Sequence, residues 1–168
     1  MATDTAELTE PELTADDLLV LEDPRFGPET VAVVTGAASG IGRATAVALA
    51  ANGLTVVGAD VNENGLEETV TLAADVGAPG DVRPIPTDLT DQADVEAMIE
   101  TAAEAGDLRY VANIAGMQHI ASLPDFPMEQ YDLLLDVMLR APFLVAKLAI
   151  PHIRATDDGV GAIANMSS

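Results

Sequence analysis

Residues 31–42, VAVVTGAASGIG, contain the pattern from which the fold of this chain is predicted. The first five residues are mostly apolar and β-branched, and they predict a buried strand over 31–35. Gly36, Gly40 and Gly42 follow with the spacing G-x-x-x-G-x-G and open an Ala-rich amphipathic segment, which predicts a helix over 40–52. Glycines permit a tight turn, and a helix N-terminus attracts negative charge. The stretch therefore predicts a diphosphate-binding strand–turn–helix unit, and a tight connection without a ligand is the alternative.

The same alternation of strand and helix continues to residue 168. Further strands are predicted over 54–59, 82–86, 108–114 and 161–166, and further helices over 63–75, 91–105 and 128–154. Pro142 falls inside the last helix and predicts a kink. The alternation predicts an α/β fold, a three-layer Rossmann-type doubly wound parallel sheet with five strands in the order 3-2-1-4-5. Its ligand crevice is expected outside the carboxyl ends of the first and fourth strands.

A chain of 168 residues is about the size of one domain. Residues 1–28 are acidic and rich in turn-forming residues, and they predict an extension with at most one short helix behind a Thr14 N-cap. The pattern changes near residue 29. We therefore expect an N-terminal extension over 1–28 and a nucleotide-binding domain over 29–168.

The charge is strongly unbalanced, with 7 Lys and Arg against 28 Asp and Glu and a net charge of −21. Such a surface repels phosphate backbones and anionic lipids, so we expect neither nucleic acid nor a membrane as a partner. Lys147 is the single lysine. Carboxylate excess with so little lysine predicts a halophilic protein that needs molar salt, and an ordinary acidic protein is the alternative.

Cysteine is absent, which excludes thiolate chemistry for this sequence. The two histidines, His119 and His152, lack ligand spacing, so no metal site is predicted. No uncharged run reaches the roughly 18 apolar residues of a spanning helix, and the first residues do not form a secretory signal. We therefore expect a cytoplasmic location.

Asp60 ends the second predicted strand, at roughly the 20-residue spacing from the first glycine that dinucleotide sites show. A carboxylate there accepts hydrogen bonds from adenosine ribose hydroxyls and repels a 2′-phosphate, which favours NAD over NADP. A helix N-cap or a solvated loop carboxylate is the alternative. Asp88, after the third strand, faces a similar choice between a ligand and a helix cap. Asn113-Ile114-Ala115-Gly116 ends the fourth strand with small residues that let a cofactor approach the backbone.

Taken in order, these motifs resemble the classical short-chain dehydrogenases/reductases over residues 25–168. The resemblance implies an NAD-dependent oxidoreductase that acts on a small-molecule secondary alcohol or ketone and forms homo-oligomers when full-length. It also implies the cofactor-binding residues, which are Gly36, Ser39, Gly40, Ile41, Gly42, Asp60, Val61, Asp88, Leu89, Asn113, Ala115 and Gly116.

The resemblance makes Ser168 the catalytic serine, which contacts the substrate oxygen. Family members continue with a Tyr-x-x-x-Lys segment, and no such segment occurs in these 168 residues. We therefore expect a cofactor-binding portion that lacks the C-terminal strands and is inactive alone. The alternative is a non-catalytic dinucleotide-binding fragment, from a truncated gene or complementing a partner chain. Met138 also replaces a family asparagine of the proton relay, and methionine cannot provide its hydrogen bonds.

The substrate signal is weaker than the cofactor signal. The segment from Gly116 to Ala121, with Leu148–His152, resembles the 3-hydroxybutyrate dehydrogenase branch of the family. That resemblance implies that Gln118 contacts a substrate carboxylate. An ordinary loop position for Gln118 and a structural role for His119 are the alternatives.

Overall fold

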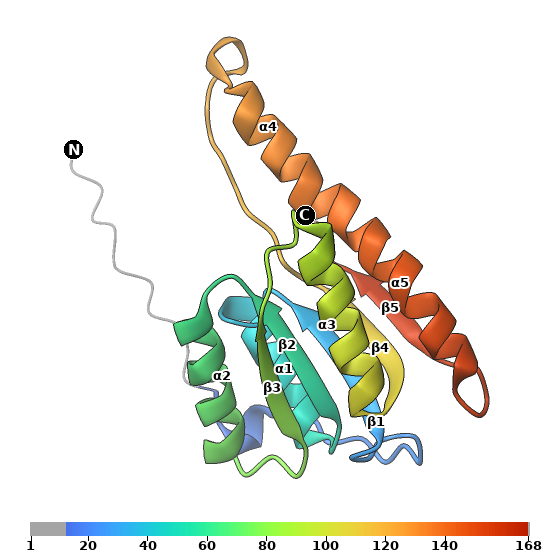
Figure 1. Cartoon of the computed structure of the whole chain (residues 1–168). Helices are drawn as coiled ribbons and strands as arrows, with labels where there is room; N and C mark the ends of the chain where they lie inside the picture. The colour runs from blue at the N-terminus through green and yellow to red at the C-terminus, as the bar shows by residue number, and fades with distance from the viewer. Residues whose placement is uncertain (1–12, 168) are drawn as a thin grey trace, which may run out of the picture.

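Five parallel strands lie in the order β3-β2-β1-β4-β5 in the computed structural model, which describes residues 13–167 (Figure 1). The predicted strand order is thus confirmed. The strands are β1 (Thr30–Thr35), β2 (Thr55–Asp60), β3 (Asp81–Pro86), β4 (Asp107–Asn113) and β5 (Ala162–Asn165). Each lies within one or two residues of its predicted bounds.

Strand β1 is the centre of the sheet and is buried along its whole length, as its Val-rich sequence predicts. It pairs with β2 on one side and β4 on the other, so that Thr35 lies beside Ala59 and Asn113 at the carboxyl ends. The chain adds β2 and β3 on one side of β1, and then crosses to add β4 and β5 on the other. This reversal puts the loops after β1 and β4 next to each other, where a ligand crevice is expected.

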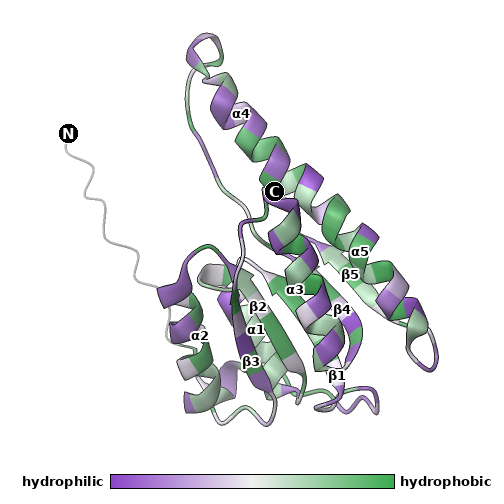
Figure 2. Cartoon of the chain, in the orientation of Figure 1, coloured by the Kyte–Doolittle hydropathy of each residue, from purple (hydrophilic) through white to green (hydrophobic). Residues whose placement is uncertain are grey.

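Helices cover both faces of the sheet and complete the three layers. One apolar core lies between the sheet and the helices α1 (Gly40–Ala51) and α2 (Glu63–Asp75), with Val34, Val47 and Leu66 fully buried. The other lies beneath α3 (Gln92–Ala105) and α5 (Ala141–Ala155) and includes Val33, Met98 and Val145. Figure 2 shows the central strands mostly in the hydrophobic colour and the helices with mixed faces.

The N-caps of α2 and α3 are not the residues that the sequence analysis offered as alternatives, Asp60 and Asp88. Asn62 caps α2, and its side-chain oxygen accepts a hydrogen bond from the Gly65 N–H at 3.1 Å. Asp91 caps α3 and accepts from the Ala93 N–H at 2.7 Å. The interpretation of Asp60 and Asp88 as N-caps is therefore wrong, because each lies too early in the chain to reach the first turn.

The helix predicted over 128–154 has three parts, α4 (Met128–Leu135), a π-helical segment (Asp136–Arg140) and α5. Pro142 lies in the first turn of α5 and has no N–H to donate to the preceding turn, and the wider π-helical turn directly precedes it. Where the sequence predicts a kink, the structure has a π-helical segment. A second proline, Pro151, lies inside α5. The α4 end projects beyond the sheet (Figure 1).

The described part of the N-terminal extension begins with a single 3₁₀ turn over Ala15–Asp17. The Asp17 carboxylate accepts hydrogen bonds from the N–H and hydroxyl of Thr14, which lowers the pKa of Asp17. The apolar residues 18–21 that follow are not helical. Their backbone is held by the Asn52 amide, which donates to the Leu19 carbonyl at 2.9 Å and accepts from the Leu21 N–H at 2.7 Å. Within residues 13–167, no helix has the length and apolar character needed to cross a membrane.

Candidate functional site

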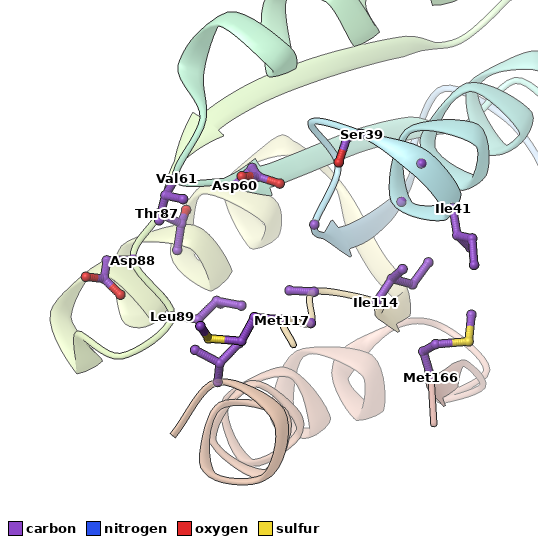
Figure 3. Close-up of a pocket in the computed structure, with 16 residues that line it drawn as sticks. Ser39, Ile41, Asp60, Val61, Thr87, Asp88, Leu89, Ile114, Met117 and Met166 are labelled. Atoms are coloured by element: carbon purple, nitrogen blue, oxygen red, sulfur yellow. The ribbon is translucent and has the colours of Figure 1, made fainter. Parts of the chain in front are cut away.

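A crevice of about 500 Å³ opens at the carboxyl ends of β1, β2 and β4 (Figure 3). Val61, Thr87 and Asp88 lie at one end of it, and Ile41 and Met166 lie at the other. It is lined by Gly36, Ser39, Gly40, Ile41, Gly42, Asp60, Val61, Thr87, Asp88, Leu89, Ile114, Ala115, Gly116, Met117, Val137 and Met166.

The structure brings together every residue predicted to bind the cofactor except Asn113. Five residues of the lining were not predicted, and three of them had a usable signal. Thr87 and Ile114 are immediate neighbours of predicted residues. Val137 and Met166 come from the π-helical segment and from the end of β5, and no local pattern connects those segments with the glycine-rich turn. Met117 extends the small-residue segment by one position.

The glycines of the turn differ in what surrounds them. Gly36 has a φ of 74°, and a Cβ there would lie 2.8 Å from the Cα of Ala115. A Cβ at Gly42 would lie 1.9 Å from the Gly36 carbonyl oxygen, so both glycines are required for the turn to pack. Gly40 has a φ of 51°, and a Cβ there would meet nothing within 4 Å. Gly40 therefore keeps open the space directly in front of helix α1.

This open space suits an anionic group. Helix α1 begins at Gly40, and the preceding Ser39 makes no side-chain capping hydrogen bond. The first N–H groups of a helix have no intrahelical acceptor and carry the positive end of the helix dipole. The N–H groups of residues 36–38 already donate to the Ala59 carbonyl and the Asp60 carboxylate, so an anionic group in the crevice would face the first turn of α1.

Asp60 is fixed by two backbone donors. Its Oδ2 accepts from the Ala38 N–H at 3.2 Å, and its Oδ1 accepts from the Asn62 N–H at 3.0 Å. A carboxylate has about four acceptor positions, so both oxygens keep capacity for further donors. The side chain is therefore oriented in advance and can accept hydrogen bonds from a diol in the crevice.

Asp88 also lines the crevice, and its Oδ1 accepts from the N–H and the hydroxyl of Thr90 at 2.9 and 2.7 Å. These hydrogen bonds, the one from the Thr90 side chain first, lower the pKa of Asp88. The carboxylate is thus held ionised in a local turn that precedes α3. Asp88 thus lies in the loop between β3 and α3, which forms one side of the crevice.

Two of the predicted residues that the structure describes lie outside the lining. Asn113 is buried, and its Nδ2 donates to the Oδ1 of Asn165 at 2.8 Å, so it connects β4 with β5. Gln118 is exposed on the irregular segment that follows β4. Ser168 lies outside the described residues. Among residues 13–167, no group of three or more His, Asp and Glu side chains is arranged to hold a metal ion.

Comparison with known proteins gives a consistent result. A family model described as short chain dehydrogenase matches residues 30–168. D-threitol dehydrogenase of Mycolicibacterium smegmatis is 37% identical over 140 residues, which cover 82% of this chain and 52% of that protein. The 3-oxoacyl-[acyl-carrier-protein] reductase FabG of Thermotoga maritima is 32% identical over 139 residues, covering 82% and 55%.

D-beta-hydroxybutyrate dehydrogenase of Cupriavidus necator is 33% identical over 141 residues, with 82% of this chain and 52% of that protein covered. The chain spans about half the length of the curated relatives it matches. The family match covers the sheet from β1 to β5 and every residue that lines the crevice. This chain belongs to the short-chain dehydrogenase family.

Proposed function

We propose that the crevice binds NAD, with the diphosphate at the N-terminus of α1 and the adenosine ribose at Asp60. The observation that carries this proposal is the position of the Asp60 carboxylate, which is fixed by two backbone N–H groups in the same crevice as the open space at Gly40. A bound nicotinamide ring would supply the hydride acceptor or donor. The carboxylate accepts from the ribose diol and opposes the additional phosphate of NADP.

We propose further that the reaction is the interconversion of a secondary alcohol and a ketone. Two relatives are named as dehydrogenases of D-threitol and of D-beta-hydroxybutyrate, and both names denote oxidation of an alcohol. A 3-hydroxy acid would carry a carboxylate, and Gln118 is the residue proposed to contact it. Gln118 is exposed and directly follows Met117, which lines the crevice. Ser168 is proposed as the donor to the substrate oxygen.

A second proposal concerns the 168 residues by themselves, which we expect to bind cofactor without turnover. Neither Tyr110 nor Tyr131 has a lysine four residues later, so the sequence provides no tyrosine–lysine pair as acid and base. A positioned acid or base contributes about 10² to 10⁴ in rate. Incubation with NAD and 3-hydroxybutyrate tests this through the absorbance of NADH. Sustained NADH formation by the purified chain would contradict it.

Cofactor binding is tested by isothermal titration calorimetry of the purified chain with NAD and with NADP. We expect NAD to bind more tightly. Asp60→Ala should weaken NAD binding about tenfold or more, because a charged acceptor for the ribose diol is lost, and should reduce the discrimination against NADP. Asp75→Ala is the matched control, because it removes the same charge from the far end of α2. Tighter binding of NADP to the unmodified chain, or no binding of NAD, would refute the proposal.

A further inference from the structure

Two opposite charges contact one residue of the glycine-rich turn. The Ala38 N–H donates to the Asp60 carboxylate at 3.2 Å, and the Ala38 carbonyl accepts from Nη2 of Arg43. Asp60 approaches the turn from β2, and Arg43 approaches it from the first turn of α1. A guanidinium therefore lies on one side of Ala38 and the proposed ribose-binding carboxylate lies on the other.

The guanidinium of Arg43 is directed toward α2 rather than into the crevice. Its Nη2 lies 2.7 Å from Oε2 of Glu68, and its Nε donates to the Thr69 hydroxyl at 3.2 Å. The Arg43 side chain is 18% exposed, whereas that of Glu68 is 68% exposed. Arg43 does not line the crevice and lies instead in a separate hollow along α2 with Glu68 and Asp75. Glu68 thus helps to hold the positive charge on the outer face of the turn.

We infer that Glu68 is a positioning residue for cofactor selectivity, which acts by holding Arg43 away from the site of a 2′-phosphate. The inference rests on the proposed NAD site. Sites that accept NADP provide an arginine for this phosphate, because a guanidinium binds phosphate through paired donors. Arg43 contacts the same turn residue as Asp60, and its ion pair with Glu68 favours the conformation that faces α2. Two carboxylates therefore favour NAD over NADP. Asp60 repels the 2′-phosphate, and Glu68 holds the Arg43 guanidinium away from it.

The effect of Glu68 should be modest because the ion pair is largely exposed. Such pairs are weak, and salt screens them further. We expect Glu68→Gln to lower the ratio of the NADP to the NAD dissociation constant about threefold. Combined with Asp60→Ala, it should lower this ratio by more than the product of the two single effects, since Arg43, no longer paired with Glu68, then meets the phosphate without an opposing carboxylate.

The test is calorimetric titration of the 168-residue chain with NAD and NADP, at the lowest KCl concentration at which circular dichroism shows it folded. Asp75→Asn is the matched control, because it removes a carboxylate from the same helix and the same hollow. The double variant Arg43→Gln/Glu68→Gln tests whether Glu68 acts through Arg43. We expect the gain in NADP affinity to disappear in it.

An unchanged ratio in Glu68→Gln would overturn the inference, and so would an equal change in Asp75→Asn or a gain that persists without Arg43. In each of these cases NAD still binds and the proposed function stands. Failure of the unmodified chain to bind NAD would overturn the proposed function and this inference together.

Discussion

The hydroxyl oxygen of Thr35 accepts hydrogen bonds from the backbone N–H groups of Ile114 and Ala115, at 3.1 and 3.2 Å. Thr35 ends β1 and is 1% exposed, and the two amides follow the end of β4. The next residue, Gly36, packs so closely on Ala115 that it has no room for a Cβ. One side chain therefore fixes the distance between the two loops that form the crevice.

Replacing Thr35 by valine should cost about 1–3 kcal/mol in the free energy of unfolding, because two amides lose their acceptor. Threonine and valine have nearly the same shape, so the substitution leaves no cavity that would add to the loss of stability. Thr35→Ser is the matched control, because it keeps the hydroxyl and removes a methyl group. Denaturant unfolding followed by circular dichroism measures the difference. Equal stability of the valine and serine variants would show that the hydroxyl does not hold the loops together.

Gly40→Ala should weaken NAD binding far more than its effect on stability predicts. Its φ of 51° makes an alanine strained by about 1–2 kcal/mol, and the new methyl would enter the crevice. Gly77→Ala is matched to it, because Gly77 has a φ of 70° and also meets nothing within 4 Å, but does not line the crevice. Calorimetry and thermal unfolding should give similar losses of stability and a loss of NAD affinity in the Gly40 variant alone. A similar effect of both variants on NAD affinity would contradict the placement of the diphosphate.

Local patterns were sufficient to predict the sheet. Buried parallel strands are continuous apolar runs. Such runs occur at Val31–Val34 and Val56–Val57, and they can be recognised without tertiary information. The right-handed connection of such units then limits the strand order to very few possibilities. The glycine-rich turn and Asp60 also depend only on residues close to them in the sequence, so their place in the crevice was predictable.

The remaining parts of the site depend on contacts between distant segments. Val137 lies in the π-helical segment that precedes Pro142, and the sequence predicts a kink there rather than a π-helical turn. Asn113 does not line the crevice, and its side chain donates instead to Asn165, which lies 52 positions away in the chain. The sequence left Asp88 as a possible N-cap of the following helix, and the structure has the cap at Asp91, which the prediction placed inside that helix.

The loop between α5 and β5 should respond to acid through Asp158. Its carboxylate is paired with the buried guanidinium of Arg109 and also accepts from the Val160 N–H at 3.0 Å, and these bonds lower the pKa of Asp158. Because the folded-state pKa lies below the unfolded value of about 3.9, the ion pair stabilises the fold above that value. This stability is lost as the pH falls through the folded-state pKa.

Asp158→Asn should therefore lower the free energy of unfolding at neutral pH, and the difference from the unmodified chain should shrink below about pH 4. Asp157→Asn is the control, because Asp157 lies 3.7 Å from Arg109 and its side chain is 89% exposed. Urea unfolding at several pH values measures both variants. A difference that stays constant across this range would mean that the Asp158 carboxylate contributes nothing as a charge.

The net charge of −21 predicts that folding requires salt. At about 0.01 M salt the Debye length is roughly 30 Å, so carboxylates across the whole surface repel one another, whereas at about 1 M it is roughly 3 Å and only neighbours interact. We expect the helical circular dichroism signal to be lost on dialysis from molar to millimolar KCl. Sucrose at the same osmolality is the control, because it favours the compact state without screening charge. Spectra that remain unchanged in dilute buffer, or that sucrose preserves as well as KCl does, would contradict a fold that depends on charge screening.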